Sequence, residues 1–144
     1  MAALLELIDV HAGYGPVTVP NGLALQLQAG ERLAMIGRNG VGKTTALRAI
    51  MGLATLSRGR IVFDGQDLHG LAPLIRQELL AAFTRLGRQG ETTLIIVEQQ
   101  VREALCYTDR ALILDHGAVA HAAPARVLQG DAATLERFVG MAVP

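Results

Sequence analysis

The run from Gly37 to Thr45, which reads GRNGVGKTT, constrains the fold of this chain more than any other feature. It follows a short apolar run, Leu33–Ile36, and precedes a segment with helical spacing that extends to about Leu53. Three glycines allow a tight turn whose backbone N–H groups converge, and the start of the following helix adds its partial positive charge. A buried strand, this turn and a helix in sequence predict a phosphate-binding loop in an α/β fold.

The residue types in this loop match nucleotide chemistry. Lys43 is the single lysine among 13 basic residues, and its ammonium can reach the β- and γ-phosphates of a nucleotide. The hydroxyl of Thr44 is a suitable ligand for Mg²⁺. The predicted nucleotide-binding residues of the loop are Gly37, Asn39, Gly40, Gly42, Lys43, Thr44 and Thr45. The competing interpretation is a glycine-rich turn that binds nothing.

Composition excludes several classes of protein. The chain has 144 residues, enough for one domain, and its 51% hydrophobic and 18% charged residues exclude a disordered chain. Thirteen basic and thirteen acidic residues give no net charge, so nucleic acid is not an expected partner. No apolar run is long enough to span a membrane, and the start of the chain lacks the basic residues of a secretory signal. Cys106 is the only cysteine, which excludes an internal disulfide and fits a reducing compartment.

Strand-like and helix-like segments alternate along the chain, which predicts an α/β class. The expected strands are residues 4–10, 23–28, 33–36, 60–64, 92–97, 111–115 and 119–122, with a turn at 13–16. The expected helices are residues 43–53, 74–86, 101–106, 125–129 and 132–139. The histidines show no metal-ligand spacing with one another or with Cys106, so no histidine metal site is expected.

Several segments outside the loop point to one family. They are Tyr14, Met51–Leu53, Ser57–Gly65, Thr93–Gln99 and Thr108–Gly117. Together with the loop they resemble the ATP-binding subunit of an ABC transporter, and most of all the LivF-type ATPase of branched-chain amino-acid importers. The ATPase of urea and amide importers is the alternative. The subfamily is indicated by Val97-Glu98-Gln99, because most ABC ATPases carry a histidine where Gln99 stands.

The resemblance implies a fold and a function. It implies a P-loop NTPase fold of the ABC type, a reduced parallel sheet with flanking helices and an N-terminal antiparallel β region. The strand 33–36 would lie between strands 92–97 and 111–115 in this sheet. The ligands implied are ATP and Mg²⁺, with Tyr14 stacking on adenine and Gln99 at the switch position near the γ-phosphate. For Tyr14 the alternative is a loop tyrosine without a ligand, and for Gln99 it is a helix cap.

By the same resemblance, the protein works with permease subunits and a second ATPase subunit. It would be cytoplasmic, peripheral on the cytoplasmic face of the inner membrane, and would hydrolyse ATP to drive amino-acid import. A nucleotide-binding module without turnover is the competing function. A small nucleotide kinase or GTPase is a third class, disfavoured because the chain lacks an Asn-Lys-x-Asp motif and an arginine-rich lid.

The resemblance breaks at one place. The chain is expected to be a single truncated nucleotide-binding domain over residues 1–144, with a block at 1–70 that contains the Walker A loop and a block at 71–144 that resembles the segment after the D-loop. The helical subdomain, the signature and the Walker B strand with its catalytic Glu are absent, so no intact catalytic residue is expected. Asp115 and Glu98 each end an apolar run, but neither is expected to face Mg²⁺. The missing segment would uncover apolar surface and favour self-association.

Overall fold

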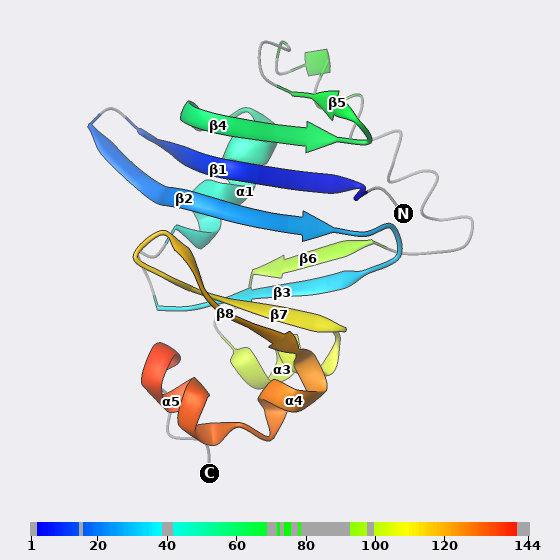
Figure 1. Cartoon of the computed structure of the whole chain (residues 1–144), viewed down its shortest axis with the longest axis vertical. Helices are drawn as coiled ribbons and strands as arrows, with labels where there is room; N and C mark the ends of the chain where they lie inside the picture. The colour runs from blue at the N-terminus through cyan, green and yellow to red at the C-terminus, as the bar shows by residue number, and fades with distance from the viewer. Residues whose placement is uncertain are drawn as a thin grey trace.

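The structure is a computed structural model, and it describes residues 3–14, 16–38, 42–68, 72, 74–75, 78, 93–97 and 100–140. Its strands are β1 (Leu5–Tyr14), β2 (Val17–Leu27), β3 (Arg32–Ile36), β4 (Thr55–Phe63), β5 (Gln66–Asp67), β6 (Leu94–Val97), β7 (Arg110–Asp115) and β8 (Ala118–Pro124). Its helices are α1 (Lys43–Met51), α3 (Val101–Cys106), α4 (Ala125–Gln129) and α5 (Ala132–Val139), as labelled in Figure 1. No helix in these described ranges is long and apolar enough to cross a membrane.

The described strands form two four-stranded sheets, which lie one above the other in Figure 1. In the N-terminal sheet the order is β2-β1-β4-β5, and neighbouring strands are antiparallel. In the central sheet the order is β6-β3-β7-β8. Here β3 is parallel to both β6 and β7, and β8 is antiparallel to β7. The predicted parallel core, with the strand before the glycine-rich loop between its two neighbours, is confirmed.

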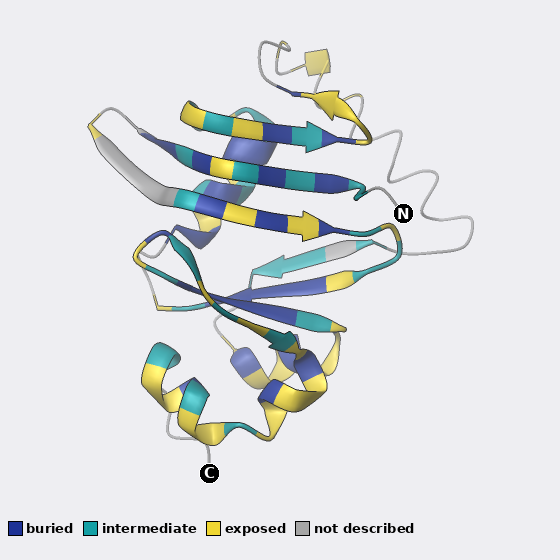
Figure 2. Ribbon diagram, in the orientation of Figure 1, coloured by how far each residue is buried: buried dark blue, intermediate teal, exposed yellow. Residues whose placement is uncertain are grey.

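The central sheet is covered on both faces, and β3 shows why its sequence suits this position. Leu33 and Met35 point into a core shared with the N-terminal sheet and α1. Ala34 and Ile36 point into a second core, which contains residues of α3, α4 and α5. Successive side chains of a strand face opposite sides, so an uninterrupted apolar run fills both cores. The dark blue of β3 and β7 in Figure 2 marks this double burial.

The strands of the N-terminal sheet are longer than predicted. β1 continues through Gly13 and Tyr14, where the sequence predicted a turn, because it pairs with β2 up to Tyr14. It pairs with β4 as well, on its other side. The pairing passes an irregularity at Asp9, whose φ is +48°. Gly59 of β4 lies against this residue, and a Cβ at Gly59 would clash with the backbone carbonyl oxygen of Asp9. Only glycine fits there.

The helices agree better with the sequence. α3, α4 and α5 have the predicted bounds, and α1 ends at Met51, slightly before the predicted end. A glycine directly follows α1, α4 and α5, and apolar spacing marks α3, so local signals suffice to recognise these helices. The predicted helix at residues 74–86 lies mostly outside the described residues.

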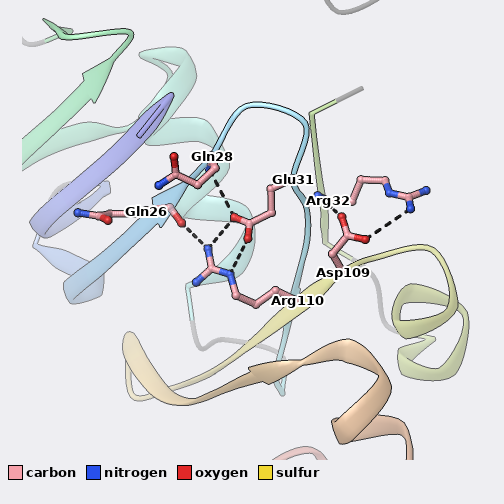
Figure 3. A network of polar contacts seen from close by, with 6 residues as sticks. All are labelled: Gln26, Gln28, Glu31, Arg32, Asp109 and Arg110. Atoms are coloured by element: carbon pink, nitrogen blue, oxygen red, sulfur yellow. Dashed lines mark hydrogen bonds and ion pairs between the residues drawn. The ribbon is translucent and has the colours of Figure 1, made fainter. Parts of the chain in front are cut away.

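A network of polar contacts joins the two sheets at the amino ends of β3 and β7 (Figure 3). The guanidinium of Arg110 donates two hydrogen bonds to the carboxylate of Glu31, from Nε to Oε2 at 3.1 Å and from Nη2 to Oε1 at 2.9 Å. Nη2 also donates to the backbone carbonyl oxygen of Gln26 in β2. Since β3 runs from this end towards Gly37, the network fixes the sheets at the end opposite to the glycine-rich loop.

A second ion pair lies beside this network. The backbone N–H of Arg32 donates to Oδ2 of Asp109 at 3.0 Å, and its guanidinium reaches Oδ1 at 3.5 Å. The backbone hydrogen bond lowers the pKa of the Asp109 carboxyl below its ordinary value. Both side chains are about half exposed, so this pair is worth less than the Arg110–Glu31 pair.

Candidate functional site

The glycine-rich loop leads from the carboxyl end of β3 to the start of α1. Because β6 and β7 run parallel to β3, their carboxyl ends lie at the same edge of the sheet as the loop. Gly37 leaves the strand with a φ of +154°, and Gly42 precedes the helix with a φ of +102°. Side chains with a Cβ rarely adopt either value, so the backbone path itself requires glycine at both positions. Asn39 and Gly40 lie outside the described residues.

Lys43 is the first residue of α1 and is buried, with 7% of its surface exposed. Its Nζ donates a hydrogen bond to the carbonyl oxygen of Gly37, so the side chain folds back across the loop. Burial lowers the pKa of this ammonium from its ordinary value of 10.5. An ammonium carries three N–H donors. This cation is therefore able to bind an anion while the loop still holds it in place.

The first turn of α1 adds further donors at the same point. Its N-cap, Gly42, has no side chain to accept backbone N–H groups, and the first turn contains no acidic residue. The Gly42 carbonyl accepts the N–H of Ala46 at 2.9 Å, as the start of a helix requires. Thr44 is exposed and Thr45 half-buried, so solvent or a hydrated cation reaches Thr44 first. The positive end of the helix dipole and the ammonium of Lys43 together favour an anionic ligand.

The remaining predicted site residues are covered only in part. Tyr14 is the last residue of β1 and pairs with Val17, but its side chain is not among those described. Gln99 and Glu98 follow β6 and lie outside the described residues. Because β6 pairs in parallel with β3, the chain that leads to Gln99 starts from the loop edge of the sheet.

The described residues contain no group of three or more His, Cys, Asp or Glu that could hold a metal ion. Asp115 ends β7 and pairs with Ala118 in the hairpin to β8. Its Oδ2 lies 3.7 Å from Nε2 of His116, an almost fully exposed side chain. Of the two threonines in the loop, Thr44 is the exposed one, so its hydroxyl is the better placed ligand for Mg²⁺.

One neighbour of the loop was missed by the sequence analysis. The guanidinium of Arg38 lies against Gly140, the residue that follows α5, and a Cβ at Gly140 would be 3.3 Å from its Nη2. A glycine after a helical segment signals the end of the helix. That signal does not reveal which residue packs against the glycine. The contact between Arg38 and Gly140 is therefore visible only in the structure.

Comparison with known proteins identifies the family to which this chain is similar. The family model described as ABC transporter matches residues 20–134. The phosphate import ATP-binding protein PstB of Tropheryma whipplei (strain Twist) is 38% identical over 91 residues, which cover 59% of this chain and 35% of PstB. The Fe(3+) ions import ATP-binding protein FbpC of Mesorhizobium japonicum is 44% identical over 66 residues, 46% of this chain and 18% of FbpC. The chain therefore spans about a third or less of the length of these relatives.

Solved structures share the fold. The structure of cbiO1 from Clostridium perfringens, part of the ABC transporter complex cbiONQ, superposes with a TM-score of 0.69. The match covers 95% of this chain and 96% of that chain, at 13% sequence identity. The chain thus has the P-loop fold of ABC ATPases, with mixed strands and helices.

Proposed function

The chain belongs to the ABC transporter family, and on this premise we propose that it binds ATP as the nucleotide-binding subunit of an importer. The observation that carries the proposal is the buried ammonium of Lys43, held against Gly37 at the start of α1. A cation, a helix N-terminus and two backbone positions suited to glycine meet there. The phosphate chain of a nucleotide needs this combination of charge and backbone donors.

The chemistry of each side chain assigns its role in this proposal. Lys43 binds the β- and γ-phosphates, and the hydroxyl of Thr44 is the ligand for Mg²⁺. The phosphate oxygens are bound by backbone N–H groups of the loop. These N–H groups belong to Gly37, Asn39, Gly40, Gly42 and Thr45. The ring of Tyr14 stacks on adenine, and Gln99 approaches the γ-phosphate. Bound Mg²⁺ would supply charge neutralisation between the two outer phosphates.

For the transported substrate we propose branched-chain amino acids, with urea or amides as the alternative. The support is the resemblance carried by Val97-Glu98-Gln99. The relatives named above carry phosphate and iron(III) ions, so family membership by itself leaves the substrate open. By the family resemblance the partners are permease subunits and a second ATPase subunit, at the cytoplasmic face of the inner membrane. Stable docking on the permease is not expected of a chain that lacks the helical subdomain.

We further propose that residues 1–70 and 71–144 are two blocks of one nucleotide-binding domain that lacks its middle. The absent parts are the helical subdomain, the signature and the Walker B strand with the catalytic Glu. Transfer of a phosphoryl group to water needs Mg²⁺ held from more than one side and an oriented nucleophile. The chain therefore binds ATP without turnover, as a non-catalytic module. Genomic sequence across the codons for Leu68 to Leu74 tests whether the protein itself lacks this middle segment, because an intact Walker B and signature there would show the gap to be an artefact.

Thermal unfolding with and without nucleotide tests the binding proposal. A ligand that binds only the folded state stabilises it by about 2.7 kcal/mol at 100 times its Kd. For a domain of this size that raises Tm by roughly 5–10 °C. Wild type should show this rise with MgATP, and Lys43→Ala should lose most of it.

Two comparisons sharpen the result. Thr44→Ala should keep a shift with ATP in EDTA but lose the additional shift that Mg²⁺ gives wild type, because its effect is confined to the metal ligand. Equal shifts for wild type and Lys43→Ala at saturating MgATP would place the nucleotide elsewhere and refute the site.

A further inference from the structure

Helix α5 is anchored along its length before it reaches the loop. At its start, Asp131 accepts hydrogen bonds from the backbone N–H of Thr134 at 3.1 Å and from the Thr134 hydroxyl at 2.7 Å. Leu135 is buried in the core that also contains Ile36, the last residue of β3. Towards its end, the ring of Phe138 stacks on that of His121 in β8, with centroids 6.3 Å apart. These contacts make α5 a fixed support beside the carboxyl end of β3.

The end of this support meets the glycine-rich loop. Gly140 ends α5 with a φ of +74°, and its N–H donates to the carbonyl oxygen of Glu136 at 3.1 Å. A Cβ at Gly140 would lie 3.3 Å from Nη2, 3.6 Å from Nε and 3.7 Å from Cζ of Arg38. Three of the guanidinium atoms therefore lie over the space that glycine leaves open.

The contact between Arg38 and the end of α5 affects the glycine-rich loop through charge and through chain connectivity. The carboxyl end of a helix carries partial negative charge, which attracts a guanidinium cation. Arg38 directly follows Gly37, whose carbonyl oxygen accepts the hydrogen bond from Lys43. A guanidinium that packs against the end of α5 would thus restrain the backbone at the point where the loop begins.

We propose that Arg38 is a positioning residue of the nucleotide site and that α5 raises nucleotide affinity by holding it. The inference rests on the proposed function, since it assigns a regulator to that same site. A loop that is already ordered loses less conformational freedom when phosphate binds, and affinity rises accordingly. Release of α5 would lower nucleotide affinity without removing any group that touches the nucleotide.

The test measures the Kd of N-methylanthraniloyl-ATP by fluorescence at a temperature where every variant is folded. Arg38→Ala should weaken binding by about two- to five-fold, the factor corresponding to a cation at a helix carboxyl end. Gly140→Ala keeps the charge but forces the guanidinium to shift by a few tenths of an ångström, and it should weaken binding by a smaller factor. The double variant should be no weaker than Arg38→Ala, because both changes break one contact. Arg38→Lys, which keeps a cation, should recover part of the affinity.

Gly65→Ala is the matched control for backbone strain. Gly65 also has a positive φ, +79°, but a Cβ there meets nothing within 4 Å. It should lower Tm and leave Kd unchanged. Loss of affinity in Arg38→Ala but not in Gly140→Ala would mean that Arg38 acts only as a charge near the phosphates, and would overturn the inference. Absence of Lys43-dependent binding in wild type would instead refute the proposed function and, with it, this role of Arg38.

Discussion

The ammonium of Lys43 donates a hydrogen bond to the carbonyl oxygen of Gly37, so the only lysine of the chain closes the loop that it belongs to. Burial lowers the pKa of Lys43 from 10.5. Below the lowered pKa both folded and unfolded chains are protonated, and the cost of burying the charge is present in full. Between that pKa and 10.5 the unfolded chain binds more protons, so the folded state gains stability as the pH rises.

We therefore predict that wild type gains stability relative to Lys43→Met as the pH rises towards 10.5. Urea unfolding of both proteins at several pH values measures this difference in stability. The titration of all other groups contributes equally to both proteins and cancels in the difference. Lys43→Arg serves as the control, because arginine stays charged over the whole range. A difference between wild type and Lys43→Met that does not vary with pH would contradict the burial of a titrating ammonium.

The Arg110–Glu31 ion pair is expected to stabilise the contact between the two sheets. Arg110→Ala should lower the free energy of unfolding by about 1–3 kcal/mol, because it leaves a mostly buried carboxylate without its charged donor. Glu31→Gln should cost less, and the two changes should not add. Arg32→Ala provides the control. Its ion pair with Asp109 is half exposed, so the loss should stay below about 1 kcal/mol. If Arg110→Ala and Arg32→Ala lowered the free energy of unfolding equally in urea, the Arg110–Glu31 pair would not be the main contact between the two sheets.

Local patterns predicted those parts of the fold that depend on local physics. The apolar run of β3 has the composition of a strand covered on both faces, and α3 to α5 follow from helical spacing, with a glycine directly after α4 and α5. The strand order came from the family resemblance. The length of β1 was wrong, because its pairing partners on both sides extend it through Tyr14.

In the site, too, local sequence patterns predicted some features and missed those that depend on distant residues. The motif predicted Gly37, Gly42 and Lys43 as parts of one loop, and the structure brings Lys43 and Gly37 into contact. The contact of Arg38 with Gly140 joins residues far apart in the sequence, and no periodicity or spacing encodes it. The roles of Tyr14 and Gln99 remain predictions.

Exposed apolar side chains close to the proposed junction predict self-association. Leu74 is 66% exposed and Ile75 52% exposed, just after residue 71, where the second block begins. Water contact with such side chains is unfavourable, and a second copy is able to cover them. At tens of micromolar, light scattering after size exclusion should give a mass above 15.3 kDa.

Substitution of both residues by glutamate should move the protein towards the monomer. Leu53→Glu is the control, since Leu53 is similarly exposed, at 58%, but lies just past the end of α1, away from the junction in sequence. A monodisperse monomer of wild type would contradict the prediction, and so would an equal effect of Leu53→Glu.

On the proposal that the Walker B strand is missing, turnover should be absent or very slow even if ATP binds as proposed. The described residues offer Thr44 on the loop for Mg²⁺ but no acidic cluster, and Asp115 belongs to the β7–β8 hairpin. Loss of one catalytic donor typically costs 10²–10³ in rate, which would reduce an ordinary rate of about 10 s⁻¹ to roughly 0.1 s⁻¹ or less. Phosphate release by wild type should therefore not exceed that of Lys43→Ala, and Asp115→Asn and Glu98→Gln should change nothing. Robust hydrolysis that depends on Lys43 and disappears in either carboxylate variant would show that the chain has recruited a new acidic residue for Mg²⁺ or water.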